Sequence, residues 1–205
     1  MVTAVRRPDR DDLEAARTRT VPDVLPRLGA DFAVLFCGIN PGLYSAATGH
    51  HFARPGNRFW LVLHLSGFTP RRLEPHEQDL LPGYGLGITN LVARASAQAA
   101  ELTRAELRAG AARLLELVLR HQPRVVAVAG VTAYRAAFDL PGARVGPQEE
   151  SLGTARLWVV PNPSGLNAHW SLQAMTAEFT RLRLAVADEA GGWPGQPRLP
   201  AGRGV

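Results

Sequence analysis

The stretch Phe32–Trp60, FAVLFCGINPGLYSAATGHHFARPGNRFW, determines how the rest of the chain is expected to be arranged. It opens with an unbroken apolar run, Phe32–Cys37, which is typical of a strand buried on both faces of a parallel sheet. Gly38–Gly42, with the sequence GINPG, then ends the strand, because glycine and proline in close succession interrupt it. This turn leaves Asn40 at the carboxyl end of the strand, which is the end where ligands bind in open α/β sheets.

A second apolar run ends in the same way much later in the chain. Arg156–Val160 breaks into Pro161–Asn167, with the sequence PNPSGLN. One Asn-Pro turn alone is more often a helix cap than a site. Two such turns at the same edge of one sheet place two rigid polar loops side by side, so we expect a functional site at that edge.

Expected strands and helices alternate along the chain, and Pro141–Gly153 is expected to be an irregular loop. This alternation predicts a three-layer α/β/α fold around a central parallel sheet of about four strands. The expected strands are Phe32–Cys37, Gly85–Leu91, Arg124–Ala129 and Arg156–Val160, and the expected helices are Asn57–Ser66, Pro75–Leu81, Thr103–His121, a helix after Gly130 through Phe138, and Ser171–Ala187.

The chain of 205 residues fits one domain with two loose ends. We expect a polar N-terminal arm over residues 1–30, the domain over 31–187 and a disordered tail over 188–205, which is rich in Gly and Pro. No segment approaches the apolar length of a membrane span, and no apolar stretch follows the N-terminal arginines as in a signal peptide. The expectation is a monomer in the cytoplasm of a bacterium, associated with the nucleoid.

Cysteine and histidine usage predicts that no metal or other cofactor is bound. Cys37 is the single cysteine, which excludes an intramolecular disulfide and a cysteine-ligated zinc or iron–sulfur site, and it is expected in the core. His50 and His51 are adjacent without an evident third ligand, so they are expected to face solvent.

Charge favours a polyanionic partner without establishing one. Every basic residue is an arginine, and the formal net charge is +5. Arginines and acids cancel up to Asp31 and again after Ala187, so this charge lies within the expected domain. A basic domain suits nucleic acid, although arginines spread over a solvated face would give the same charge.

Four motifs between Phe32 and Ala187, in this order, resemble the mismatch-specific uracil-DNA and thymine-DNA glycosylases of the uracil-DNA glycosylase superfamily. The motifs are Gly38–Leu43, Gly49–Trp60, Gly87–Val92 and Asn162–Leu166. The resemblance implies a uracil-DNA glycosylase-like fold and hydrolysis of the N-glycosidic bond of uracil in double-stranded DNA, with a preference for G:U mispairs and an extension to thymine or other damaged pyrimidines. The implied partner is a duplex with a mispaired or damaged pyrimidine that is flipped into a pocket.

The resemblance also implies roles for individual residues. Asn40 would orient the attacking water, because an amide can hold a water by hydrogen bonding although it is a poor base. Phe52 would stack on the flipped base, the alternative being an anchor that fixes its loop in the core. The implied substrate-binding residues are Gly38, Ile39, Gly42, Ser45, Phe52 and Asn90.

The last motif resembles the loop that enters the base stack. Leu166 would be the apolar wedge that fills the space left by the flipped nucleotide; the alternative is that it covers the apolar end of the final helix. The implied DNA-binding residues are Asn162, Ser164, Gly165, Leu166 and Asn167.

One position departs from the family in a way that bears on chemistry. The family commonly reads Leu-Val-Asp-Arg where this chain has Leu91–Arg94 with Ala93, so the carboxylate expected at position 93 is missing through natural variation or an introduced substitution. Ala93 contributes no chemistry, so the expected turnover is low. The alternative function is a non-catalytic binder of mispaired or abasic DNA that uses the same pocket and wedge.

Overall fold

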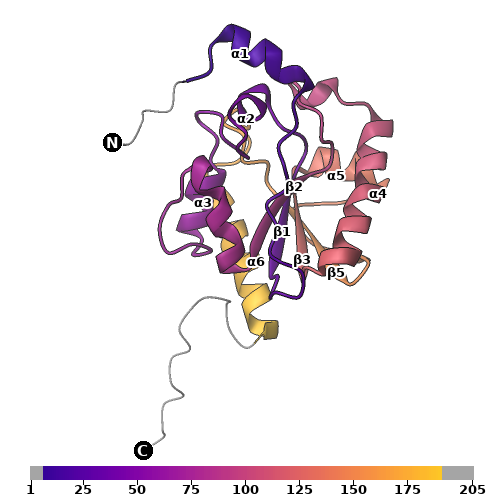
Figure 1. The fold of residues 1–205 in the computed structure, drawn as a ribbon. Coiled ribbons are helices and arrows are strands. Elements are labelled where there is room, and N and C mark those ends of the chain that lie inside the picture. The colour runs from indigo at the N-terminus through magenta and orange to yellow at the C-terminus, as the bar shows by residue number, and fades with distance from the viewer. Residues whose placement is uncertain (1–6, 191–205) are drawn as a thin grey trace, which may run out of the picture.

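Residues 7–190 are described by a computed structural model, in which a central sheet lies between two layers of helices (Figure 1). The sheet has five strands, and the four that lie next to one another from β2 to β5 are parallel. β1, β2 and β3 are buried along their whole lengths, as the continuous apolar runs predict. The predicted α/β fold with a central, mainly parallel sheet is therefore confirmed. In spatial order the strands are β2 (Leu86–Asn90), β1 (Val34–Gly38), β3 (Val125–Ala129), β5 (Ala155–Val160) and β4 (Gly146–Leu152).

Helices α3 and α6 cover one face of the sheet, and α4 and α5 cover the other (Figure 1). The predicted capping box of α4 is present, because Thr103 and Glu106 bond each other's backbone N–H groups. The helices are α1 (Arg10–Ala15), α2 (Leu43–Thr48), α3 (Phe59–Leu65), α4 (Arg104–His121), α5 (Val131–Phe138) and α6 (Leu172–Ala190), with shorter 3₁₀ turns η1 (Ala16–Thr18), η2 (Pro75–Tyr84) and η3 (Ala99–Glu101).

Each face of the sheet has its own apolar core. On the α3/α6 side, the ring of Phe36 packs edge-on against Phe59 at a centroid distance of 5.4 Å and stacks on Phe179 at 5.8 Å. On the α4/α5 side, Cys37 is fully buried, and burial raises the pKa of its thiol. Cys37 is therefore an unreactive core side chain, as expected from its place in the apolar run.

The expectation of an irregular loop at Pro141–Gly153 is wrong, because Gly146–Leu152 forms the fifth strand, β4. It pairs antiparallel with β5, and Gly153 makes the turn with a φ of 59°. β4 lies at the edge of the sheet and is mostly exposed, so its sequence GPQEESL lacks the apolar run of a buried strand. Its pairing comes from backbone hydrogen bonds, which leave no side-chain pattern.

The segment predicted as a polar arm lies on the domain from residue 7 onward. Ala16 and Val21 are buried against the α2 region, and Val24 exchanges backbone hydrogen bonds of 2.9 and 2.8 Å with Ile88 of β2. This segment therefore covers the edge strand of the sheet. At the other end α6 continues to Ala190, past the expected boundary at 188; residues 191–205 of the predicted tail lie outside the described residues.

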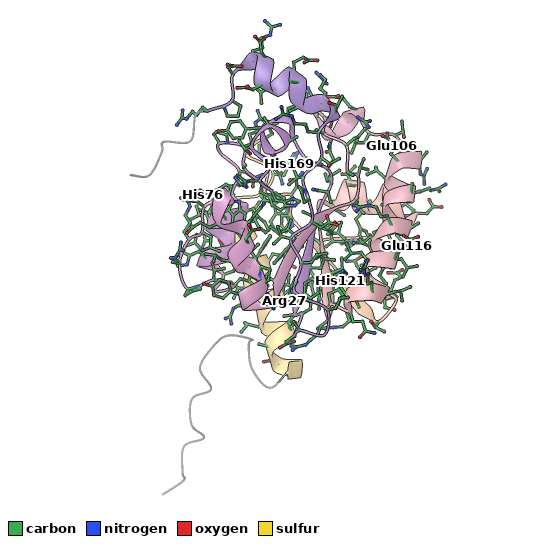
Figure 2. The ribbon with its side chains drawn as sticks, viewed as in Figure 1. Arg27, His76, Glu106, Glu116, His121 and His169 are labelled. Atoms are coloured by element: carbon green, nitrogen blue, oxygen red, sulfur yellow. The ribbon has the colours of Figure 1, made fainter. Side chains whose placement is uncertain are left out.

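All four parallel strands end at the same edge of the sheet. The chain leaves β1 for β2 on one side and later returns to β3 on the other, so the order of strands reverses between β1 and β3. Such a switch point is where open α/β sheets bind ligands. His169, in the loop after β5, lies toward this edge, whereas Arg27 and His121 lie near the opposite one (Figure 2).

The packing of α4 on β2 requires a glycine at position 110. A Cβ on Gly110 would overlap the carbonyl oxygen of Leu91 and lie 2.8 Å from its carbonyl carbon, and backbone at that place cannot move aside. We expect Gly110→Ala to lower the free energy of unfolding by about 1–3 kcal/mol, although alanine is the better helix former. Gly83→Ala is the control, because its Cβ would meet nothing within 4 Å. Urea unfolding tests this, and equal stability of the two variants would contradict it.

Candidate functional site

A cavity of about 800 Å³ opens at the carboxyl edge of the sheet, between the loops that follow β1, β2, β3 and β5. Most of the predicted site residues lie in its wall, whereas Ala93 and Gly165 do not. The loops that begin at the two Asn-Pro turns lie close together here. Gly130 sits between them, because a Cβ built on it would be 3.5 Å from Ile39 in one loop and 3.5 Å from Asn162 in the other. The predicted residues that line it are Gly38, Ile39, Asn40, Gly42, Ser45, Phe52, Asn90, Asn162, Ser164, Leu166 and Asn167.

The floor of the cavity is formed where β1 and β2 end side by side. Gly38 and Asn90 are paired in the parallel register, and the backbone N–H of Leu91 continues the ladder to the Gly38 carbonyl at 2.9 Å. A Cβ on Gly38 would overlap Oδ1 of Asn90 and lie 3.3 Å from the ring of Phe52. Glycine is therefore required here, because only its bare backbone lets both side chains reach the floor.

Asn40 is held in one orientation by three acceptors. Its Nδ2 donates to the carbonyl oxygens of Pro41 (3.2 Å) and Arg94 (3.1 Å) and to Oγ of Ser96 (2.8 Å). Two of these partners can only accept, so the nitrogen of the amide must face them. The carbonyl oxygen Oδ1 is thereby left to accept a hydrogen bond from a molecule in the cavity.

Phe52 is anchored on the core and also reaches the cavity. Its ring stacks on Phe59 with centroids 4.1 Å apart, which anchors it on the core, and it also lines the cavity. Its φ of 53° is uncommon for a bulky residue, and such backbone conformations cluster at functional sites. Ser45 supports this loop, because its buried Oγ accepts a 3.1 Å bond from the N–H of Ala53. Gly42 begins helix α2 and bridges to Ser96, which ties the two loops together.

The expectation that His50 and His51 face solvent is wrong for His51, whose exposed fraction is 2%. Its Nε2 lies 2.9 Å from the carbonyl oxygen of Pro22, and its Nδ1 lies 3.3 Å from Nδ2 of Asn90. The pKa of His51 is lowered, and burial of the ring is the largest cause. The ring is therefore neutral at neutral pH. No spacing in the sequence indicates this burial, because Pro22 and Asn90 are distant from His51 in the chain.

The loop after β5 is braced internally and presents its leucine outward. Asn162 Oδ1 accepts from the N–H of Ser164 at 3.0 Å, and Asn167 Nδ2 donates to the carbonyl of Asn162 at 2.9 Å. Leu166 is 71% exposed, so the alternative that it covers the final helix is wrong. Gly165 lies against the other loop, because a Cβ on it would be 2.6 Å from the carbonyl oxygen of Gly56.

Arg58 holds this loop in place, a role that its sequence motif did not reveal. Its guanidinium donates to the carbonyl oxygens of Trp170 (2.6 Å), Asn167 (2.9 Å) and Ser164 (3.2 Å). Its own N–H donates to the carbonyl of Pro163 at 2.9 Å. One partly buried cation therefore bonds three carbonyl groups of this turn.

Comparison with known proteins agrees with this architecture. Residues 26–185 match the family described as "Uracil DNA glycosylase superfamily". The chain belongs to this superfamily. A solution NMR structure of a candidate uracil DNA glycosylase from Methanosarcina acetivorans has a similar fold, with a TM-score of 0.55 and 21% sequence identity over 80% of this chain and 98% of that one.

The cavity of this superfamily member contains no carboxylate among its lining residues. Ala93 is exposed beside it. The backbone N–H of Val92 donates to the carbonyl oxygen of Ile39, and the carbonyl oxygen of Arg94 accepts from Nδ2 of Asn40. An aspartate at position 93 would therefore lie next to the residue expected to hold the water. Within residues 7–190, no three acidic, histidine or cysteine side chains gather as metal ligands, and no helix there is long and apolar enough to cross a membrane.

Removal of the Arg58 guanidinium should loosen the turn that carries Leu166. Hydrogen bonds to a charged donor contribute about 1.5–3 kcal/mol, so we expect Arg58→Met to speed amide exchange in residues 164–170 by roughly 10–100-fold. Arg54→Met is the control, since Arg54 is an exposed arginine shortly before Arg58 in the chain. Hydrogen–deuterium exchange measures both variants. Unchanged exchange in Arg58→Met would show that the turn is stable without the guanidinium.

Proposed function

We propose that this protein is a monofunctional DNA glycosylase that hydrolyses the N-glycosidic bond of uracil in double-stranded DNA and prefers uracil mispaired with guanine. The observation that carries the proposal is the meeting of Asn40, Phe52 and Asn90 in one cavity, with exposed Leu166 at its rim. The same cavity would admit thymine or other damaged pyrimidines. A methyl group changes discrimination by only about 1–3 kcal/mol.

A flipped pyrimidine would meet a site that is already formed. The ring of Phe52, supported from behind by Phe59, offers a face for stacking. Oδ1 of Asn90 would accept a hydrogen bond from N3–H of uracil, and backbone N–H groups near Ile39 and Phe52 would bind its carbonyl oxygens. Because the supporting hydrogen bonds exist before the base arrives, little reorganisation would be required.

Cleavage would proceed through a sugar with oxocarbenium character and a departing base that carries negative charge. A water that donates a hydrogen bond to Oδ1 of Asn40 would keep its lone pair free to attack C1′ of the sugar. Backbone donors at the carbonyl oxygens of uracil would stabilise the departing anion. With no carboxylate in the cavity wall, the proton of the water would pass to solvent, so cleavage is expected to be slow.

The rim of the cavity suits a DNA duplex. Leu166 can enter the space that a flipped nucleotide leaves, and the exposed backbone of Gly165 and Leu166 can reach the orphaned guanine. The carbonyl groups of Ser164 and Asn167 are already bonded to Arg58, so they would brace the loop and leave the base contacts to its tip. Exposed Arg54 and His169 lie on the same rim and would face the phosphate backbone.

Two further features bear on the reaction class. The sequence contains no lysine, so a lysine Schiff base and the strand cleavage that follows from it are excluded. The absence of a carboxylate from the cavity wall favours one alternative, a non-catalytic binder of mispaired or abasic DNA. Both functions use the same wedge and pocket, and they differ only in whether uracil is released.

A single-turnover assay on a duplex with one G:U mispair separates these two functions. A positioned general base contributes about 10²–10⁴-fold, so we expect Ala93→Asp to speed uracil release by at least about 100-fold. Asn40→Ala should lower the rate, because it removes the oxygen that orients the water. Ala105→Asp is the control for added charge, since Ala105 is exposed in the first turn of α4 outside the cavity wall.

The outcomes have distinct meanings. Faster release by Ala93→Asp, with Ala105→Asp unchanged, supports the glycosylase. If every variant binds the mispair and none releases uracil above background, the protein is a binder and the proposed activity is wrong.

The wedge can be tested independently of cleavage. Leu166→Ala should weaken binding to a G:U duplex by about tenfold or more, because the smaller side chain leaves the stack unfilled and unstacking costs a few kcal/mol. Leu184→Ala is the matched control, since Leu184 is an exposed leucine on α6. Fluorescence anisotropy gives both affinities, and equal affinities would exclude insertion of Leu166.

A further inference from the structure

His51 links the N-terminal segment to the floor of the cavity through its two ring nitrogens. The carbonyl oxygen of Pro22, 2.9 Å from Nε2, can only accept, so Nε2 carries the proton. In the neutral ring, Nδ1 then has a lone pair, and Nδ2 of Asn90 at 3.3 Å can donate to it. The tautomer of His51 is therefore set by a backbone carbonyl that lies outside the cavity wall.

The same contact decides which way the amide of Asn90 is turned. With Nδ2 facing His51, Oδ1 faces Gly38 and the cavity. No donor among residues 7–190 bonds to this oxygen at hydrogen-bonding distance. The backbone of Asn90 is also fixed, because Arg113 donates to its carbonyl oxygen. Rotation of the terminal amide is therefore the main freedom left to the residue.

We propose that His51 is a positioning residue that turns Oδ1 of Asn90 toward the base, so that the pocket accepts pyrimidines that carry a proton on N3 and rejects cytosine. This inference rests on the proposed glycosylase function and names the group that would set its selectivity. Uracil and thymine present N3–H as a donor, whereas N3 of cytosine is an acceptor and would face Oδ1 without a proton between them. Such an unpaired contact in a buried site is strongly disfavoured.

The arrangement depends on His51 being uncharged. Protonation of Nδ1 would turn it into a donor that opposes Nδ2 of Asn90 and favours the rotated amide. Burial and neighbouring His50 lower the pKa of His51, whereas the hydrogen bond to Pro22 and the carboxylate of Asp23 act in the opposite direction. Arg113 lies beside Asp23, at 3.7 Å, and offsets its charge. Selectivity should thus be full at neutral pH and decrease in acid.

The test compares binding to two duplexes that cannot be cleaved, one with a 2′-fluorinated uridine and one with a 2′-fluorinated cytidine, each opposite guanine. The unaltered chain should prefer the first. In His51→Leu, which lacks the acceptor, the ratio of the two affinities should fall about tenfold, the factor expected for one hydrogen bond in a buried site. His51→Gln can donate to Pro22 and accept from Asn90 without titrating, so it should keep the preference and remove its decrease in acid.

His50→Gln is the matched control, because His50 is the neighbouring histidine and lies outside the cavity wall. An unchanged preference in His51→Leu, or the same acid response in His51→Gln, overturns the inference. If the unaltered chain shows no preference for uracil, the proposed function fails and the inference fails with it. Nitrogen NMR of the unaltered protein adds a test that needs no variant: a proton on Nδ1 of neutral His51 overturns the assignment.

Discussion

The site depends on one backbone constraint, the pairing of Gly38 with Asn90 at the ends of two parallel strands. The register is fixed because both strands are fully buried and shift only if the whole apolar pattern shifts with them. At the last pair, one residue contributes an amide and the other contributes nothing, since any Cβ on Gly38 would occupy the place of the Asn90 oxygen. The cavity floor thus exists because a side chain is missing at one specific position.

Neighbouring groups orient the side chains that would contact a ligand. Ser96 and two carbonyls turn Asn40, His51 turns Asn90, and Arg58 fixes the loop around Leu166. Asn40 and Asn90 are neutral, so their contribution depends on direction rather than on charge. Fixed dipoles of this kind stabilise developing charge without having to reorganise during the reaction. Under the proposed function, recognition and catalysis would use different atoms, so slow cleavage would be compatible with a selective pocket.

The buried strands and the capped helix starts are the parts of the fold that the sequence predicts. The runs at Phe32–Cys37 and Arg124–Ala129 are strands, and the Thr103–Glu106 pair begins its helix. Edge strand β4 was missed because backbone pairing sustains it without an apolar pattern. His51 and Arg58 were missed as supports because each bonds backbone carbonyls distant in sequence, Pro22 in one case and Asn167 in the other. Such contacts produce no regular spacing in the sequence. The sequence therefore predicts the loops around the cavity better than the hydrogen bonds that hold them.

The contact between Gly56 and Gly165 has a consequence for how the protein can diverge. It joins the loop that carries Phe52 to the loop that carries Leu166, and it does so through backbone alone. A contact without side chains cannot be tuned by substitution; it is either kept or broken. The two loops must therefore evolve as one unit of fixed length, and new lesion preferences should arise at exposed neighbours such as Arg54 and His169, which can vary without separating them.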